Sequence, residues 1–329
     1  MKKNQIGIIG LGYWATNIIN TLEKMGYKNI HCFDINSKNI NILKRKFQYI
    51  KIYKNINEIL KLDLLGIIIV TNTKNHFPIA KLCLENNHNI FVEKPVTDSS
   101  KKIKQLIKLA KIKKKIIMSG YIYNYNVYIE YIKKILTKKT LGKINYISFE
   151  RSNLGPVRND ISCVLDLAAH DIATCVYLFK KKINIIKAFG LDLLKKNIFD
   201  MSTIFLKVNN TSIEIKSSWL NPQKIRKIII VGSKKMLLFD EMDRINPVKI
   251  YHKYAVYPKI DTFKKKFFTQ KANIYYGKTF FPNINYTSPL TLEMQSFINS
   301  VNNNKKPKTD GIFSLKVMSL IEKVNKKIS

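Results

Sequence analysis

A glycine-containing turn between an apolar strand and an amphipathic helix constrains this chain more than any other feature. Residues 6–9 form an apolar run that predicts a buried strand, and Gly10-Leu11-Gly12 follows it directly. A helical pattern begins after the turn and ends near Gly26. A second strand-like run, residues 29–33, ends on the acid Asp34. Strand, glycine turn, helix, strand and acid, in this order, make up a dinucleotide-binding unit.

Each residue of the turn suits a dinucleotide. Gly10 permits a tight turn, Gly12 lets the backbone approach a pyrophosphate, and Ala15 is small enough for the helix to pack closely on the strand. The helix N-terminus adds unpaired N–H groups and a positive dipole. Tyr13 and Trp14 lie in the same turn and are counted with the cofactor-binding residues. The alternative is a strand–turn–helix that binds no ligand.

Asp34 also bears on which cofactor is bound. It lies 22 residues after Gly12 (34 − 12), the usual distance for an acid that pairs with the ribose hydroxyls. Because a carboxylate repels a 2′-phosphate, the sequence favours NAD over NADP. Ser37 and Lys38, just beyond, would soften that preference.

The strongly basic composition does not predict a specific nucleic-acid-binding protein. The formal net charge is +36 over 329 residues, yet only five of the 58 basic residues are arginine, the side chain that nucleic-acid surfaces favour. Lysine is spread over nearly every segment. The densest basic stretch, residues 101–115, has the apolar spacing of an amphipathic helix with a solvated lysine face. We expect at most non-specific attraction to polyanions at low salt.

The remaining composition indicates a soluble cytoplasmic protein without a metal site. The four cysteines are widely separated and form no Cys-x-x-Cys pair, which fits a reducing compartment and predicts neither zinc nor redox chemistry: Cys32, Cys83, Cys163 and Cys175. Glycines interrupt the apolar start of the chain, so a signal peptide explains it less well than the strand and turn do. No run approaches the ~18 apolar residues of a membrane span.

The first third of the chain alternates strands and helices, which predicts a doubly wound parallel sheet of about six strands. Further strands are expected at residues 51–53, 64–70, 90–92 and 115–119, and helices at 55–60, 76–85 and 98–113. The last of these helices is expected to be capped by Asp98 or Thr97. We assign residues 1–120 to an NAD-binding Rossmann domain.

Residues 121–329 read as a second, α+β domain for substrate binding and oligomerisation. Helices are expected at 127–137 and 164–179, and strands at 144–151, 183–190, 202–208, 211–219, 225–231 and 235–239. Consecutive strands predict a mostly antiparallel open sheet. Such a sheet would expose an apolar face, so we expect a homodimer or homotetramer. Residues 240–288 show no clear pattern. Helices return at 290–301 and 311–327, and the last is expected to contact the first domain.

Polar residues follow two of the predicted parallel strands. Thr71, Thr73 and His76 come after the strand at 64–70, and Glu93-Lys94-Pro95 follows the strand at 90–92. Ligands of open α/β sheets bind at the carboxyl ends of strands, so we count these residues as cofactor-binding candidates. A lysine there suits a substrate oxygen or the nicotinamide ribose. The alternatives are a polar loop that caps the next helix and an ordinary exposed turn.

Asp166 and His170 form a third candidate site. They are four residues apart and therefore share one face of a predicted helix. A carboxylate and an imidazole in this arrangement suit an orienting acid and a base that transfers a proton, because histidine titrates near neutral pH. A helix cap with a surface pair, or half of a metal site without further ligands, would give the same spacing.

Taken together, these motifs resemble the glucose–fructose oxidoreductase/inositol dehydrogenase (Gfo/Idh/MocA) family. The resemblance rests on the glycine turn with Tyr13-Trp14, Asp34, the segment from Thr73 to His76, Phe91 to Pro95, and Asp166 to His170. It implies a Rossmann domain, an open antiparallel sheet, bound NAD(P), and hydride exchange at a secondary alcohol of a sugar or polyol. The family's active-site lysine matches Lys94, and its aspartate and histidine match Asp166 and His170.

Further residues point to the branch of this family that acts on nucleotide-linked sugars. The segment from Arg151 to Arg158, leading to Asp166, resembles that branch and contains two of the five arginines. Arginine binds phosphate bidentately, so we expect Arg151 or Arg158 to bind substrate. The alternative is an internal salt bridge, for instance with Asp160. Tyr121 stands where many relatives have histidine, which would alter the substrate pocket.

The expected reaction follows from these assignments. His170 exchanges the hydroxyl proton, Asp166 orients it or the sugar, and Lys94 polarises the same oxygen while hydride moves to or from the nicotinamide. Two other readings remain: a dehydrogenase of a free polyol such as inositol, and an NAD-binding regulator without turnover.

Overall fold

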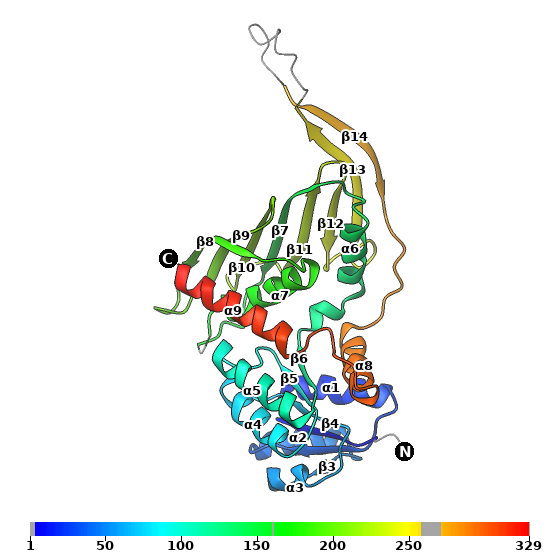
Figure 1. Ribbon diagram of the computed structural model, residues 1–329, viewed down its shortest axis with the longest axis vertical. Coiled ribbons are helices and arrows are strands. Elements are labelled where there is room, and N and C mark those ends of the chain that lie inside the picture. Colours follow the sequence, from blue (N-terminus) through cyan, green and yellow to red (C-terminus); the bar gives the residue numbers. More distant parts are fainter. Residues whose placement is uncertain (1–3, 160, 258–270, 329) are drawn as a thin grey trace. The chain divides into compact units, whose positions relative to one another are not determined.

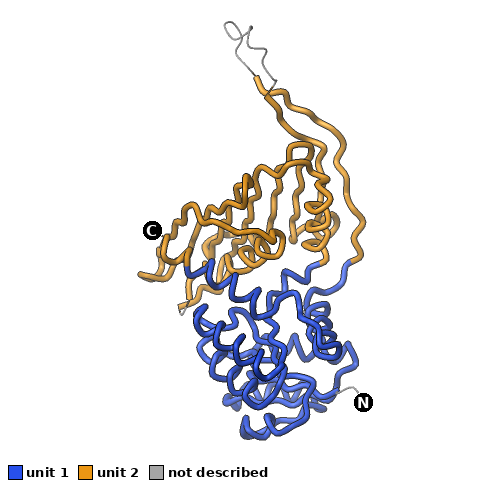
Figure 2. The backbone as a smooth tube through the Cα atoms, viewed as in Figure 1, with its two compact units in different colours: residues 1–126, 286–322 blue, residues 127–285, 323–329 orange. Residues whose placement is uncertain are grey.

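The computed structural model describes residues 4–159, 161–257 and 271–328, which form two compact units (Figures 1 and 2). The first unit comprises residues 1–126 and 286–322, and the second comprises 127–285 and 323–329. The boundary therefore lies six residues after the expected one. Helix α8 (Pro289–Asn302) and most of α9 (Gly311–Lys327) also belong to the first unit. Met294 and Phe297 of α8 are part of its core.

The first unit is built on a parallel sheet of six strands in the order β3-β2-β1-β4-β5-β6. This is the doubly wound order, in which the chain adds strands first on one side of β1 and then on the other. The strands β1 and β4 at its centre are completely buried, as their apolar sequences predict. The strands are β1 (Ile6–Ile9), β2 (Ile30–Phe33), β3 (Lys51–Ile52), β4 (Gly66–Ile69), β5 (Ile90–Glu93) and β6 (Ile117–Gly120).

The helices of this unit differ from the expected ones in three details. A helix, α2, follows Asp34 where none was expected, and α4 begins three residues earlier than predicted. The cap of α5 is Ser99, whose hydroxyl accepts from the Lys102 N–H, and not Asp98 or Thr97. The helices are α1 (Tyr13–Lys24), α2 (Ser37–Lys46), α3 (Ile56–Leu60), α4 (Thr73–Glu85), α5 (Ser100–Lys113), α8 (Pro289–Asn302) and most of α9 (Gly311–Lys327), with a short 3₁₀ turn η1 (Ile122–Tyr125).

The second unit contains an eight-stranded sheet in the order β14-β13-β12-β11-β7-β10-β9-β8. All neighbours pair antiparallel except β7 and β10, which are parallel, so the expected mostly antiparallel sheet is confirmed. The strands are β7 (Ile144–Ser152), β8 (Asn184–Leu191), β9 (Met201–Val208), β10 (Thr211–Ser218), β11 (Ile225–Gly232), β12 (Met236–Asp240), β13 (Val248–Val256) and β14 (Asn273–Phe280).

Two parts of this unit were not anticipated. Strands β13 and β14 occupy the stretch without a clear sequence pattern, and they form a long two-stranded ribbon at one edge of the sheet (Figure 1). The single helix expected at 164–179 divides into a π-helical turn, η2 (Val164–Ala168), and α7 (Ala169–Leu178). A π-turn rotates the side chains relative to a regular helix, and π-bulges are frequent at functional sites. Helix α6 (Val127–Thr137) lies beside α7 and has its expected bounds.

Candidate functional site

The glycine turn after β1 has the geometry of a dinucleotide cradle. Gly10 has a φ of +92°, and a Cβ there would lie 2.7–2.8 Å from atoms of Val70 and Thr71, so only glycine fits. Gly12 is the N-cap of α1, and a Cβ at Gly12 would meet no atom of the described residues within 4 Å. The space above the helix N-terminus is therefore open, which is what a pyrophosphate requires.

Asp34 is held at the edge of this turn by three donors. Its Oδ2 accepts from the Leu11 N–H at 2.6 Å and from the Asn39 amide at 3.2 Å, and its Oδ1 accepts from the Asn36 N–H at 2.8 Å. The first bond joins the carboxylate directly to the glycine turn. Asn36 and Asn39 were not among the predicted site residues, although both lie within five residues of Asp34.

A cavity of about 270 Å³ joins these elements. It lies at the carboxyl ends of β1, β2 and β4, where open α/β sheets bind their ligands. Four predicted cofactor residues line it together: Gly10, Gly12, Asp34 and Thr71. The open glycine and the carboxylate fit the adenosine and pyrophosphate part of an NAD(P) cofactor.

The other residues of the turn play different parts. Ala15 is fully buried and donates its N–H to the Gly12 carbonyl at 3.1 Å, as expected for the small residue under the turn. Tyr13 is 84% exposed. Trp14 directs its indole N–H to the Glu93 carboxylate at 2.7 Å, which links the glycine turn to the end of β5.

His76 joins two of the predicted loops from inside the protein. Its Nδ1 lies 2.8 Å from the Pro95 carbonyl oxygen and its Nε2 lies 2.8 Å from the Thr71 carbonyl oxygen. The ring is buried, and burial lowers its pKa despite the two backbone contacts. His76 therefore fixes the position of the cofactor loops instead of presenting its ring to a ligand. Thr73 is the first residue of α4.

The segment Glu93-Lys94-Pro95 is fixed by its own acid. The Glu93 carboxylate accepts from the Lys94 N–H at 3.1 Å as well as from Trp14. Gly120 on β6 lies directly against it, because a Cβ there would be 2.8 Å from that carboxyl group. Lys94, the proposed catalytic lysine, is partly exposed at the carboxyl end of β5.

Tyr121 is packed more deeply than a substrate contact requires. It is 2% exposed and lies edge-to-face with Phe313, with ring centroids 5.5 Å apart. Burial raises the pKa of its hydroxyl, so the phenol stays neutral. Its contact with substrate remains a prediction.

In the second unit, Asp166 lies in the π-helical turn η2. It accepts a hydrogen bond from Trp219, the residue that follows β10. The Trp219 indole N–H donates to its Oδ2 at 3.1 Å. Trp219 is fully buried, so its ring is a rigid support for the acid. Sequence reasoning placed Trp219 in a strand and gave it no role, because its partner lies 53 residues away.

His170 is the second residue of α7, one turn after Asp166, and it is partly buried. Its carbonyl oxygen accepts from the Thr174 hydroxyl at 2.9 Å, which reinforces the helix at that point. The π-turn ends just before it, so the two candidate catalytic groups stand on successive turns of one continuous helical segment. Their action as a catalytic pair stays a prediction.

Arg151 is part of an internal ion pair. Its Nε and one terminal nitrogen donate to the two oxygens of Asp171 at 3.0 and 2.8 Å, and both residues are almost completely buried. Arg151 therefore forms an internal salt bridge, which was the alternative to substrate binding, and its partner is Asp171. Asp160, the partner suggested above, lies outside the described residues. Because Asp171 follows His170, this pair anchors the catalytic end of α7 to β7.

Arg158, the second arginine of this segment, stays a predicted substrate contact. It is partly buried in the loop after β7. That loop is organised by Arg226, which donates to the Ser152 carbonyl at 2.8 Å and to the Asn153 side chain at 2.5 Å. Arg226, like Trp219, was not among the predicted residues.

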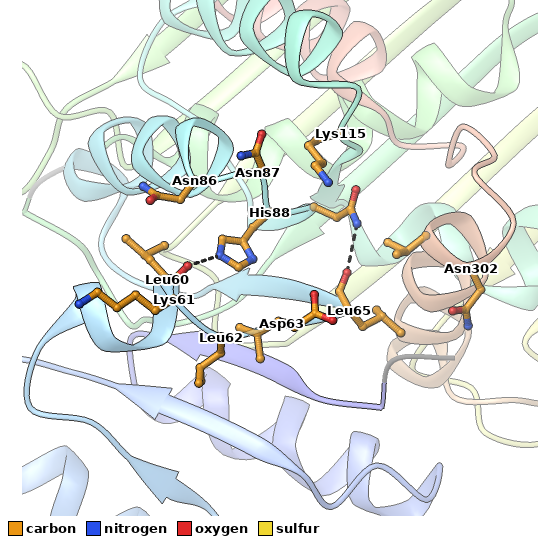
Figure 3. Close-up of a pocket in the computed structure, with 13 residues that line it drawn as sticks. Leu60, Lys61, Leu62, Asp63, Leu65, Asn86, Asn87, His88, Lys115 and Asn302 are labelled. Carbon is orange, nitrogen blue, oxygen red and sulfur yellow. Dashed lines mark hydrogen bonds between the residues drawn. The ribbon is translucent and has the colours of Figure 1, made fainter. Parts of the chain in front are cut away.

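A larger cavity, about 590 Å³, lies elsewhere in the first unit (Figure 3). It is bordered by the segments that precede β4, β5 and β6, so it opens at the amino ends of the parallel strands. Polar groups there serve the protein itself: His88 Nε2 lies 2.9 Å from the Leu60 carbonyl oxygen, and Asn89 donates to the Leu65 carbonyl at 3.1 Å. Its position at the opposite edge separates it from the cofactor site.

A protein-family model matches most of the first unit. Residues 4–121 match the family model of the Gfo/Idh/MocA proteins, described as an oxidoreductase family with an NAD-binding Rossmann fold. The match covers the glycine turn, Asp34 and Glu93-Lys94-Pro95, so the resemblance inferred from the sequence is confirmed.

Two curated relatives support the same family. The chain is 24% identical over 192 residues to UDP-N-acetylglucosamine 3-dehydrogenase from Acidithiobacillus ferrooxidans, covering 58% of this chain and 59% of that protein. It is 20% identical over 201 residues to myo-inositol 2-dehydrogenase from Thermotoga maritima, covering 59% and 60%. The chain thus spans about three fifths of the length of the curated relatives it matches.

The fold extends over the whole chain. The solved structure of the Acidithiobacillus ferrooxidans enzyme superposes with a TM-score of 0.79 at 19% identity, over 98% of this chain and 97% of that one. A 3-ketoreductase from Actinomadura kijaniata, solved with TDP-benzene and NADP, gives 0.78 at 12% identity, over 98% and 97%. The fold of these solved structures is therefore present over nearly the whole chain. Each helix among the described residues is too short or too polar to cross a membrane.

Proposed function

We propose that this protein is an NAD-dependent oxidoreductase that acts on a secondary alcohol or ketone of a nucleotide-linked sugar. The observation that carries the proposal is the cavity at the carboxyl ends of β1, β2 and β4, where Gly12 leaves space for a pyrophosphate and Asp34 presents a carboxylate. The Gfo/Idh/MocA match of the same residues supports it.

The residues that would hold the cofactor are those of the cavity and the turn. The Gly12 end of α1 offers N–H groups and positive dipole to the phosphates, and Asp34 accepts from ribose hydroxyls. When bound, the nicotinamide accepts or supplies the hydride. Asp34 makes NAD the preferred form, since a 2′-phosphate would face a carboxylate that three donors already hold in place.

The protein's own groups would handle the proton. His170 takes the proton of the substrate hydroxyl during oxidation and returns it during reduction, and its imidazole is suited to both at neutral pH. Asp166, held by Trp219, orients that imidazole or the sugar. The Lys94 ammonium polarises the substrate oxygen on which charge develops.

The nucleotide-linked substrate rests on two observations. One curated relative is named UDP-N-acetylglucosamine 3-dehydrogenase, and Arg158 provides a guanidinium for a diphosphate near the catalytic helix segment in sequence. The other relative is named myo-inositol 2-dehydrogenase, which favours a free polyol as the second candidate.

A substrate panel separates these possibilities. Purified protein is incubated with UDP- and dTDP-sugars or free polyols, together with NAD or NADH, and the absorbance of the reduced nicotinamide is followed. A signal with one nucleotide sugar supports the proposal, and Arg158→Lys should then raise the KM for that substrate. A signal with polyols alone rules out the nucleotide sugar. Bound NAD without turnover on any substrate would favour a regulator.

We propose that the exposed face of the eight-stranded sheet binds a second copy of the chain. Side chains alternate along a strand, so Ile204 and Leu206 of β9 are buried while Phe205 between them is exposed. Ile229 of β11 is also exposed, and the strand registers place it in line with Phe205 across β7 and β10. Light scattering of the wild type and of Ile229→Lys tests this, because the charge should lower the mass if the face is an interface. A cytoplasmic location is part of the same proposal.

A further inference from the structure

The side-chain amide of Asn39 borders the cofactor cavity together with Asp34. Asn39 lies in the first turn of α2, and both residues line the cavity of about 270 Å³ at the carboxyl ends of β1, β2 and β4. The Asn39 side-chain nitrogen lies 3.2 Å from Oδ2 of Asp34. An ionised carboxylate only accepts hydrogen bonds, so the group that faces it must be the NH2 end of the amide. Asn39 therefore places a donor beside the carboxylate that the cavity presents.

The oxygens of Asp34 are largely occupied by the protein itself. A carboxylate offers about four acceptor positions, which are shared between its two oxygens. The Leu11 N–H and the Asn39 amide donate to Oδ2, and the Asn36 N–H donates to Oδ1. About one position thus remains, whereas the 2′- and 3′-hydroxyls of a ribose would together require a second. Asp34 can accept from both hydroxyls only after the Asn39 amide gives up its bond.

Other polar groups in the first turn of α2 are engaged or face away from the cavity lining. The Asn36 side chain caps the helix and accepts from the Lys38 and Asn39 N–H groups at 3.0 and 3.4 Å. Ser37 and Lys38 are exposed, and neither is among the lining residues that the structure describes. The sequence suggested that Ser37 and Lys38 would soften the cofactor preference, whereas the structure brings the Asn39 side chain to the cavity.

We propose that Asn39 determines how strictly this protein selects NAD over NADP. The inference rests on the proposed function, because it requires that the cavity binds the adenosine part of the cofactor. The Asn39 amide competes with a ribose hydroxyl for Oδ2 of Asp34, which lowers the affinity for NAD. Its second N–H can donate to the 2′-phosphate of NADP, which raises the affinity for that cofactor. Both effects narrow the preference that Asp34 alone would produce.

A purely structural role of Asn39 makes the opposite prediction. If the amide served only to hold Asp34 in place, its removal would weaken NAD binding. The carboxylate is also held by the N–H groups of Leu11 and Asn36, at 2.6 and 2.8 Å, and both bonds are shorter than the bond to Asn39. Loss of the longest of these bonds should therefore leave Asp34 in position, with one acceptor position more for the ribose.

The experiment measures the affinities of the wild type and of Asn39→Ala for NAD and NADP by isothermal titration. Removal of the amide frees Oδ2 for a second ribose hydroxyl, so NAD should bind about three- to tenfold more tightly. NADP loses a donor to its 2′-phosphate and should bind about tenfold more weakly. The ratio of the NADP to the NAD dissociation constant should therefore increase by more than about tenfold. Alanine favours helix, so the variant should keep its fold.

A second variant and two smaller ligands test where the effect arises. Asn39→Asp adds a carboxylate beside Asp34 and should weaken NADP binding further than Asn39→Ala does, because like charges repel. AMP and adenosine 2′,5′-bisphosphate differ only in the 2′-phosphate and contain no nicotinamide, and Asn39→Ala should shift their affinity ratio in the same direction. Asn57→Ala is the matched control, since Asn57 is an exposed asparagine in the first turn of α3. It should leave both ratios unchanged.

The outcomes separate this inference from the proposed function. An unchanged ratio in Asn39→Ala, or a lower ratio caused by weaker NAD binding, would overturn the role of Asn39 and leave the proposed function intact. The expected shift in the ratio without turnover on any substrate would support the role of Asn39 and contradict only the proposed reaction. A wild-type protein that binds neither the cofactors nor the adenosine fragments would contradict both.

Discussion

The two units hold their functional acids in different ways. Asp34 in the Rossmann unit is bound mainly by backbone N–H groups, those of Leu11 and Asn36. Asp166 and Asp171 in the sheet unit are bound by side chains from distant strands, Trp219 and Arg151. The cofactor side therefore depends on the path of the backbone, and the catalytic helix segment depends on a few long-range side-chain pairs. Substitutions should affect the second more strongly.

The largest effect is expected where the buried ion pair is broken. Arg151→Ala leaves the Asp171 carboxylate buried without its partner, which should lower the free energy of unfolding by about 3–5 kcal/mol. Chemical denaturation measures this. The control is Lys102→Ala, which removes an exposed pair with Asp98 and should cost at most about 1 kcal/mol. Equal losses in the two variants would contradict the anchoring role of Arg151.

Removal of the reacting groups comes next. Lys94→Ala and His170→Ala should each lower kcat by about 10²-fold or more, because each removes a group that acts on the substrate oxygen. Both variants should keep the wild-type melting temperature within a few degrees. Lys61→Ala, in the larger cavity at the other edge of the sheet, is the control for a lysine of the same unit. If kcat of both Lys94→Ala and His170→Ala equalled that of the wild type, the catalytic assignment would be wrong.

The next prediction concerns Asp34, the acid that backbone N–H groups hold in place. Asp34→Asn keeps an oxygen for the Leu11 N–H but removes the charge, so NAD should bind about tenfold more weakly and the preference over NADP should shrink. Isothermal titration with both cofactors measures the two affinities. Asp63→Asn, beside the larger cavity, controls for the loss of a negative charge. An unchanged ratio of the two affinities would remove Asp34 from cofactor selection.

The smallest effect is expected at the tryptophan that supports Asp166. Trp219→Phe keeps an aromatic ring and removes one N–H donor, which should lower kcat by about three- to tenfold with a smaller change in KM. Tyr177→Phe removes a hydroxyl of α7 that is bonded to Glu130 of α6, and it should leave kcat unaffected. Equal kcat values for Trp219→Phe and the wild type would show that Asp166 is oriented without this bond.

Much of the Rossmann unit was predictable because its signals are local. The glycine turn, the apolar runs of β1 and β4 and the acid after β2 follow one another in sequence, and the doubly wound topology places their ends together. Helix α2 was missed because lysines and asparagines hide its short apolar stripe. Strand β14 was missed because nearly all of its side chains are exposed, so no alternation of buried and polar residues marks it. Strand β13 alternates only at its start, where Val248 and Ile250 are buried.

The candidate site was predictable only where its residues carry their own signal. The four-residue spacing of Asp166 and His170 was visible in the sequence. The role of Arg151 was not, because a substrate phosphate and an internal acid were equally reasonable partners for it. Trp219 gave no polar signal at all. Glu293 did give one, as an acid on the apolar stripe of a helix.

By itself the sequence determined the order of the elements, the dinucleotide turn and the types of groups available for chemistry, since these depend on neighbouring residues and their periodicity. Only the tertiary structure decided which charges meet. It paired Arg151 with Asp171 and placed the Trp219 indole against Asp166. Burial removes the water that would otherwise stabilise each charge, so the identity of the partner sets whether a group is ionised, neutral or anchored.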